Sequence, residues 1–311
     1  MGACDDLNRS SVERTMPHLP LVVSWKKTTS ETNVTAIGIF YFATEYGHSV
    51  VDVAQDIEQR GFESLWLPEH THIPASRKTP YASGAELPKE YAHTLDPFVA
   101  LAAAATVTER IRLATGISLL IERDTITTAK TVATLDVLSQ GRAILGVGGG
   151  WNREEAEHHG VDWSRRFQKL EEQIGALKAI WTREEASFSG EHIRFDPIWS
   201  WPKPIQRPHP PIVLGGETDH TLRRVIKHCD GWLPRARDPE NVLSGIVRLH
   251  ELAREADRDP ESISINVFAP RPDAVLINQF KDMDVERIIL WLPPEERDGI
   301  SRRLDGYTRF L

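Results

Sequence analysis

The sequence predicts an α/β fold in which parallel strands close into a (β/α)8 barrel. The clearest observation is one strand–helix–strand unit, formed by an apolar run at Ile111–Leu120, a helix-period segment at Thr125–Leu138 and a second apolar run at Ala143–Val147. A crossover of this length joins parallel strands. The same alternation recurs along the chain, and a count of eight strands and eight helices favours a barrel over an open sheet. The length of 311 residues is ordinary for one barrel.

Each expected strand is a short apolar run, and each expected helix has apolar residues three or four positions apart. Asp96 and Pro97 suit the start of the second helix, and Gly141 can supply a left-handed C-cap to the third. The expected strands are Ala36–Phe42, Ser64–Leu67, Ile111–Leu120, Ala143–Val147, Ile212–Leu214, Gly231–Leu233, Ile263–Phe268 and Arg287–Leu292. The expected helices are Ser49–Arg60, Pro97–Val107, Thr125–Leu138, Ser164–Trp181, Asp219–His228, Pro239–Ala256, Asp273–Met283 and Glu295–Phe310.

Three segments depart from this alternation. Pro68–His93 has no regular pattern, and a structureless excursion of that length is usually functional. A hairpin at Ala186–Pro197 and the proline-rich Trp201–Pro211 form an insertion before strand five. Residues 1–34 are polar, and we expect a loosely ordered N-terminal extension there, followed by a single barrel domain at 35–311.

The composition narrows the class of protein. The net charge of −8 argues against a nucleic-acid partner. The two cysteines cannot build a disulfide framework, and no apolar run reaches the length of a membrane span. The start of the chain lacks a basic stretch followed by an apolar one, so we predict no secretory signal. These observations favour a cytoplasmic protein without a membrane partner.

Glycines follow the fourth expected strand in the sequence GVGGGWN, Gly146–Asn152. Trp151 stands where a dinucleotide-binding fingerprint needs its third glycine, and no lysine follows as in a P-loop. Gly148, Gly149 and Gly150 therefore indicate bare backbone that a flat ligand can approach closely. Thr115, Gly116 and Ile117 end the third strand in a similar way, where the glycine is equally typical of a β-bulge.

Polar residues follow the second expected strand. Glu69 and His70 are candidate groups for proton transfer. His70 and His72 together also resemble a metal-binding pair. A metal hydrolase needs further ligands at other strand ends, and strands five to eight offer none, so we predict no metal site.

Gly215, Gly216 and Glu217 precede the helix that begins near Asp219. The free N–H groups and the positive dipole end of such a helix suit a phosphate. The alternative is an ordinary N-terminal cap by Thr218 or Asp219.

Together these residues resemble the luciferase-like monooxygenase superfamily, and within it the oxidoreductases that use coenzyme F420, a 5-deazaflavin. The resemblance is close over about residues 36–240. It is carried by GFESLWLPEH (Gly61–His70), ERIRLATGI (Glu109–Ile117), AKTVATLDVLSQGRAILGVGGGWNREE (Ala129–Glu155), FQKLEEQIGALKAIW (Phe167–Trp181), PKPIQRPHPPIVLGG (Pro202–Gly216) and DGW (Asp230–Trp232).

The resemblance implies a barrel with an insertion before strand five and a non-proline cis peptide at Gly116–Ile117 behind the deazaflavin ring. It implies that His70, preceded by Glu69, lies near the reactive carbon of the ring, that Gly148–Gly150 contact the cofactor and that Gly215 and Gly216 hold its phosphate. Sugar-phosphate dehydrogenases of this branch have a catalytic glutamate where this chain has Trp151. We therefore expect Trp151 to shape an apolar substrate pocket. Family members are commonly dimers, so a homodimer is expected.

The resulting hypothesis is an F420-dependent oxidoreductase that transfers a hydride between C5 of the deazaflavin and a small organic substrate. Two alternatives stay open at this point. One is an FMN-dependent monooxygenase that uses oxygen, and the other is a barrel that binds a flavin without turnover.

Overall fold

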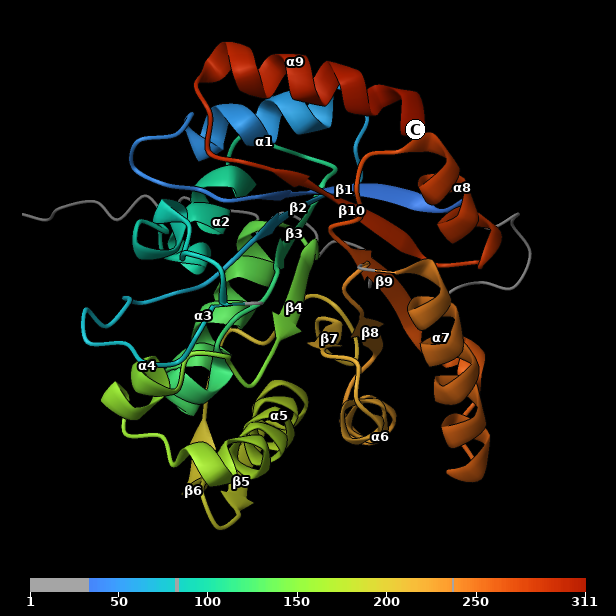
Figure 1. The fold of residues 1–311 in the computed structure, drawn as a ribbon. Coiled ribbons are helices and arrows are strands. Elements are labelled where there is room, and N and C mark those ends of the chain that lie inside the picture. The colour runs from blue at the N-terminus through green and yellow to red at the C-terminus, as the bar shows by residue number, and fades with distance from the viewer. Residues whose placement is uncertain (1–33, 82–83, 237) are drawn as a thin grey trace, which may run out of the picture.

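The computed structural model describes residues 34–81, 84–236 and 238–311, so nearly all of the extension predicted at 1–34 lies outside the described residues. Eight strands pair in parallel and close into a barrel, in which the first strand lies beside the last (Figure 1). The predicted (β/α)8 barrel is therefore confirmed. In barrel order the strands are β1 (Ala36–Tyr41), β10 (Arg287–Leu292), β9 (Ser264–Phe268), β8 (Gly231–Leu233), β7 (Ile212–Gly215), β4 (Ala143–Val147), β3 (Arg112–Thr115) and β2 (Ser64–Leu67).

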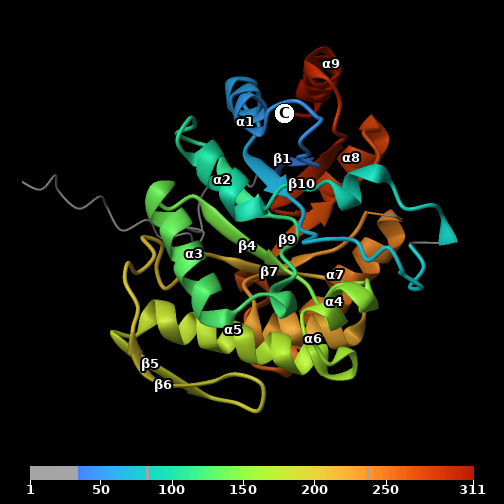
Figure 2. The same cartoon turned by 90° about the vertical axis from the view of Figure 1, so that its left-hand side faces the viewer.

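One helix follows each barrel strand and packs on the outside of the barrel (Figures 1 and 2). Asp96 accepts hydrogen bonds from the N–H groups of Phe98 and Val99, and Gly141 adopts a positive φ of 82°, as the sequence predicts. The helices are α1 (Val50–Gln59), α2 (Pro97–Ala105), α3 (Thr125–Leu138), α5 (Arg166–Thr182), α6 (Asp219–His228), α7 (Pro239–Glu255), α8 (Ala274–Asp282) and α9 (Arg297–Tyr307). Among the described residues no helix is long and apolar enough to cross a membrane.

The predicted insertion lies between β4 and β7. It contains the antiparallel hairpin of β5 (Glu185–Ser189) and β6 (Arg194–Trp199), which lies beside α5 (Figure 2). Between β4 and α5, ahead of the insertion, lies α4 (Arg153–His158), a short helix that the sequence did not predict. The spacing of apolar residues could not reveal α4, because its six residues are too few to show helical periodicity.

The third strand is shorter than predicted, so the boundary at Leu120 was wrong. β3 ends at Thr115, and the chain leaves the sheet at Gly116–Ile117, whose peptide bond is cis as the resemblance implies. Leu119, Leu120 and Ile121 are nevertheless buried. The apolar run reflects this burial in a loop and a short 3-10 helix, and not a longer strand.

Aromatic and aliphatic side chains fill the barrel because alternate residues of each strand point inward. Phe40, Trp66 and Ile289 lie in the fully buried middle layer. Phe268 and Trp291 pack on this layer from nearer the carboxyl ends of the strands and remain half-buried. Each fully buried side chain contributes about 1.5–3 kcal/mol to stability, so the layer makes a firm support for whatever binds above it.

The amino-terminal end of the barrel is closed by charged and polar groups. Arg287 is buried, and its guanidinium donates to both oxygens of Glu63, each at 2.6 Å, and to Asn266. Paired and hydrogen-bonded charges of this kind can stay buried at acceptable cost. The barrel interior is therefore filled at this end by the protein's own side chains.

Asp136 on α3 anchors the proline-rich part of the insertion. Its buried carboxylate accepts hydrogen bonds from the backbone N–H groups of Ile205 and Gln206, at 2.7 and 2.9 Å, and from the Gln206 side chain at 2.7 Å. Burial raises the pKa of Asp136, and these three donors oppose that shift. The carboxylate thus fixes the chain that leads into β7.

We predict that Asp136→Ala lowers the free energy of unfolding by about 3 kcal/mol or more, because it leaves several buried donors without an acceptor. Asp196→Ala, at an exposed position of β6, is the matched control and should change stability by no more than about 0.5 kcal/mol. Urea unfolding followed by circular dichroism checks both variants. Equal stability of the two would contradict the anchoring role.

Candidate active site

Backbone groups of glycine-containing turns lie together at the carboxyl ends of four adjacent strands, β2, β3, β4 and β7. The N–H of Gly116 donates to Leu67 O at 2.7 Å, which joins the turn after β3 to the end of β2. The N–H of Ser118 donates to Gly146 O at 2.7 Å, and the N–H of Gly148 donates to Ser118 O at 3.2 Å. β4 then pairs with β7 through Val147 and Leu214. The predicted cofactor turns therefore lie side by side at one edge of the barrel.

Ile117 is the apolar centre of this surface. A Cβ at Gly148 would lie 2.0 Å from Cδ1 of Ile117, and a Cβ at Gly215 would lie 3.8 Å from its Cγ2. Ile117 is half-buried, whereas Gly116 and Ser118 on either side of it are buried. The side chain therefore packs across two glycines and presents an apolar surface at the mouth of the barrel, which suits a flat ring.

Two turns need glycine for their backbone conformation as well. Gly150 has a φ of 66° and Gly216 has a φ of 118°, a region that residues with a Cβ rarely adopt. Nothing in the protein approaches the Cβ position of Gly150 closer than 3.6 Å. A Cβ at Gly150 would meet Leu119, Ile121 and Glu122 at ordinary van der Waals distances, so it is the backbone conformation that calls for glycine there.

His70 lies at the rim of the same mouth and is held from two sides. Its Nδ1 is 2.7 Å from Oε2 of Glu155, and Nε1 of Trp151 donates to its Nε2 at 3.3 Å. An indole N–H can only donate, so we assign the lone pair to Nε2 and the proton to Nδ1, from which it is donated to Glu155. In this state Nε2 is the nitrogen that can accept a proton.

Glu155 on α4 is a site residue that the sequence analysis missed. Its side chain is 1% exposed, and its second oxygen accepts the N–H of Thr71 at 3.2 Å. The sequence carried little signal for it, because Trp151 precedes α4 (Arg153–His158) and a helix of six residues shows no periodicity. Glu155 and Trp151 both reach His70 from the segment that follows the glycine turn.

Aromatic rings form the outer wall of the mouth. The ring of Tyr91 lies 5.2 Å from that of His70, and the ring of Tyr81 lies 5.7 Å from that of Trp151. The two tyrosine hydroxyls are 3.1 Å apart, and Arg77 lies over the Trp151 ring at 5.6 Å. The wall is apolar with a few polar groups, as is usual for small-molecule sites. Trp151 therefore lies where a residue that shapes a substrate pocket is expected.

Glu69 holds the turn after β3 in place. Its buried carboxylate accepts hydrogen bonds from the Ser118 hydroxyl at 2.6 Å and from the Leu119 N–H at 2.7 Å, and it pairs with Arg123. With both oxygens engaged, Glu69 is poorly placed to exchange protons with a substrate. The contacts favour a positioning role over the catalytic role that the sequence suggested.

Glu122 is a buried acid without a hydrogen-bond partner. Both carboxyl oxygens are buried and unpaired, and Oε1 lies 3.9 Å from the Cβ position of Gly150. Burial, together with the charges of Glu155 and Glu69, raises the pKa of Glu122 to about 9. The group is therefore a neutral acid at pH 7, directly behind the glycine turn.

The turn after β7 leads into α6, whose N-terminus has the ordinary cap by Thr218 that the sequence left open as the alternative to a phosphate site. Thr218 caps α6 by accepting the N–H of Thr221 at 3.2 Å, and Gly216 precedes it. Glu217 is committed to Arg235, whose Nε and Nη2 donate to it at 2.8 and 2.6 Å. The predicted role of Glu217 in cofactor binding stays a prediction. Its contacts show that it positions Arg235 beside the turn.

Arg166 on α5 contributes a cation near the glycine turn after β4. Its Nε donates to Gly149 O at 3.1 Å, and its guanidinium lies over the rings of Trp163 at 3.7 Å and Phe167 at 4.3 Å. A Cβ at Gly149 would lie 2.6 Å from Phe167. Arg166 and Phe167 therefore both contact the glycine turn at Gly149 and hold it in place.

His72 points away from His70. Its Nε2 is 2.8 Å from Nδ1 of His158, with the two rings stacked 5.1 Å apart. Over residues 34–81, 84–236 and 238–311, no group of three or more histidine, cysteine or acidic residues is arranged to hold a metal ion.

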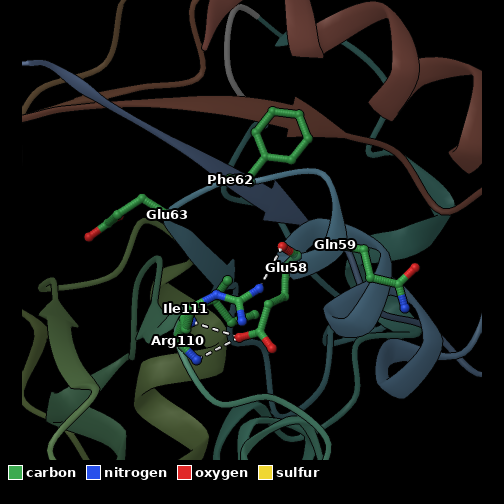
Figure 3. Close-up of a pocket in the computed structure, with 7 residues that line it drawn as sticks. Glu58, Gln59, Phe62, Glu63, Arg110 and Ile111 are labelled. Carbon is green, nitrogen blue, oxygen red and sulfur yellow. Dashed lines mark hydrogen bonds between the residues drawn. The ribbon is translucent and has the colours of Figure 1, made fainter.

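A separate hollow of about 370 Å³ lies at the opposite end of the barrel, before β2 and β3 (Figure 3). The Glu58 carboxylate fills part of it and accepts the N–H groups of Arg110 and Ile111 at 2.6 and 3.0 Å. These hydrogen bonds tie the loop that precedes β3 to the end of α1. In barrel enzymes this end serves stability, while the carboxyl end carries the chemistry.

The family model for luciferase-like monooxygenases matches residues 27–272. The chain belongs to this family. The fold of solved relatives agrees, since the structure of a monooxygenase from Streptomyces bottropensis superposes with a TM-score of 0.73 at 18% identity and covers 89% of this chain and 98% of that one.

Curated relatives of this luciferase-like protein differ in cofactor. An uncharacterized Mycobacterium tuberculosis protein, Rv0953c, is 39% identical over 85% of this chain and 94% of its own length. An FMNH2-dependent dimethylsulfone monooxygenase of Pseudomonas putida is 32% identical over 45% of this chain and 39% of its own. An F420-dependent hydroxymycolic acid dehydrogenase of Mycobacterium tuberculosis is 28% identical over 68% and 55%. The family is therefore one of flavin or deazaflavin oxidoreductases.

We predict that Glu122→Gln removes a pH dependence of stability. The folded protein keeps Glu122 protonated between its ordinary pKa of 4.5 and about 9, whereas the unfolded chain ionises it. Wild-type stability should therefore fall as the pH rises through this window, because the unfolded state binds fewer protons. Urea unfolding at several pH values should show the advantage of the glutamine variant growing with pH. A constant difference would contradict a buried neutral acid.

Proposed function

We propose that this luciferase-like protein is an F420-dependent oxidoreductase that transfers a hydride between C5 of the deazaflavin and a small organic substrate. The observation that carries the proposal is the adjacency of three bare turns, Thr115–Ile117, Gly148–Gly150 and Gly215–Gly216, with His70 at their rim. When bound, F420 supplies a ring carbon that accepts or donates a hydride and reacts poorly with oxygen.

The residues present fit such a group. Ile117 and the glycines beside it offer a flat apolar surface, since the Ile117 side chain packs over the Cβ positions of Gly148 and Gly215. The N-terminus of α6 after Gly216, together with Arg166, offers positive potential for an anionic tail. These residues would hold the ring and the tail respectively.

His70 supplies the proton chemistry in this proposal. A substrate hydroxyl that takes the place of the Trp151 N–H gives its proton to Nε2, and Glu155 stabilises the imidazolium that results. In the reverse direction, the protonated Nε2 donates to a carbonyl oxygen. Tyr91, Tyr81 and Trp151 exclude water from one side of this position.

The second candidate is an FMN-dependent monooxygenase, which the 32% identity to the FMNH2-dependent enzyme favours. Titration of the purified protein with F420 and with FMN, followed by quenching of tryptophan emission, separates the two. We expect F420 to bind at least about tenfold more tightly than FMN, a difference of about 1.4 kcal/mol. Tight binding of FMN alone would overturn the F420 assignment.

We predict that His70→Ala lowers turnover about 100-fold or more while it changes cofactor affinity only a few-fold, since the imidazole moves a proton and the turns hold the ring. His250→Ala, at a half-buried histidine on α7, is the matched control and should retain turnover. Steady-state rates and cofactor titration check both. Unchanged turnover in the His70 variant would contradict the catalytic role of His70.

A further inference from the structure

Residues 77–81 form part of the aromatic outer wall of the mouth, although little packing holds them there. They belong to the irregular stretch after β2 and lie in no helix or strand. Lys78 and Pro80 are exposed, as are Ala75 and Ser76 just before the segment. A segment with so few buried contacts opens easily unless specific interactions hold it.

Two side chains of this segment reach the site. The Arg77 guanidinium lies 5.6 Å from the centre of the Trp151 ring, and the Tyr81 ring lies 5.7 Å from it. The Tyr81 hydroxyl is 3.1 Å from that of Tyr91, whose ring is 5.2 Å from the ring of His70. The wall beside His70 is therefore complete only while residues 77–81 stay in place.

Glu154 ties the backbone of this segment to α4. Its Oε1 accepts the N–H of Lys78 at 2.9 Å and the N–H of Thr79 at 3.2 Å, and its Oε2 accepts the Thr79 N–H at 3.4 Å. A hydrogen bond from the Thr79 side chain, followed by those from backbone N–H groups, lowers the pKa of Glu154 to about 2, so the group is a carboxylate at pH 7. Arg77 adds a hydrogen bond within the segment by donating to the Thr79 carbonyl.

The same short helix also orients the proposed catalytic histidine. Glu155, the next residue of α4, lies 2.7 Å from Nδ1 of His70, and Trp151 lies two residues before the helix. Glu154 and Glu155 therefore fix two parts of the loop after β2 from one element. The distance between the wall and His70 depends on both contacts.

We propose that Glu154 is a positioning residue, which holds residues 77–81 against Trp151 and so sets the substrate-facing wall of the site. Its effect on the reaction rests on the proposed function, whereas the arrangement that it holds does not. With the segment in place, Tyr81 and Arg77 cover Trp151 and limit the access of water to the region of His70. Release of the segment opens this side and leaves the cofactor turns unchanged.

Limited proteolysis of the cofactor-free protein tests whether Glu154 holds the segment. Trypsin cleaves after Arg77 and Lys78 when this backbone is free to enter the protease, and mass spectrometry of the fragments locates the cut. Glu154→Ala should be cut there on the order of tenfold faster than the wild type, because cleavage follows the population of the open form. Glu154→Gln should stay within about twofold of the wild type, since its amide oxygen can accept the same N–H groups.

Glu157→Ala is the matched control, because Glu157 lies on the same helix and pairs with Arg153 of that helix at 2.6 Å. Its cleavage rate should equal that of the wild type. The urea midpoints of Glu157→Ala and Glu154→Ala should both equal that of the wild type, since a released loop leaves the barrel intact. Equal cleavage of Glu154→Ala and the wild type, a glutamine variant cut as fast as the alanine variant, or a lowered midpoint in Glu154→Ala would overturn the proposal.

The emission of Trp151 reports on the wall itself. The Trp151 signal is the difference between each protein and the same protein with Trp151→Phe, and acrylamide should quench it about twofold more strongly in Glu154→Ala. The affinity for F420 should change less than about twofold in Glu154→Ala, because other turns hold the ring. An unchanged Trp151 signal, or a large loss of F420 affinity, would contradict the positioning role. If the wild type binds no F420, the proposed function fails, while the trypsin and acrylamide results keep their meaning.

Discussion

Among the glycines that the structure describes, the tightest approach to another backbone is that of β4 to β3 where their turns begin. A Cβ at Gly146 would lie 2.0 Å from the carbonyl oxygen of Thr115, and the Thr115 hydroxyl donates to Gly146 O at 2.7 Å. Backbone, unlike a flexible side chain, cannot yield to such a clash. Glycine at position 146 therefore lets the two turns meet, and the surface formed by Ile117 and the glycines of β4 depends on that meeting.

The two ends of the barrel are built differently. The amino-terminal end is fixed by the pair of Arg287 and Glu63 and by the buried aromatic layer above it. The carboxyl end carries loops whose polar groups hold one another, such as Glu69 with Ser118 and Glu155 with His70. Chemistry on loops above a rigid support is how barrel enzymes vary their reactions. The cofactor surface and the proton-handling groups thus come from neighbouring loops.

Much of the fold could be predicted because its signals are local. Helical spacing, as in Thr125–Leu138, and the caps at Asp96 and Gly141 depend on residues close in the chain. The roles of Glu69 and Glu122 could not be predicted, since they depend on which groups from distant segments meet them. Burial of a lone carboxyl has no periodic signature, and the apolar run after β3 was misread because packing, not a strand, explains it.

A crystal structure of the complex with F420 would test the central claim most directly, namely that bare backbone at adjacent strand ends forms the binding surface for a flat ring. The account predicts that the ring packs on Ile117 and the Gly148–Gly150 turn, with His70 beside the substrate side of the ring. A ring bound elsewhere, such as in the hollow lined by Glu58 and Arg110, would contradict it.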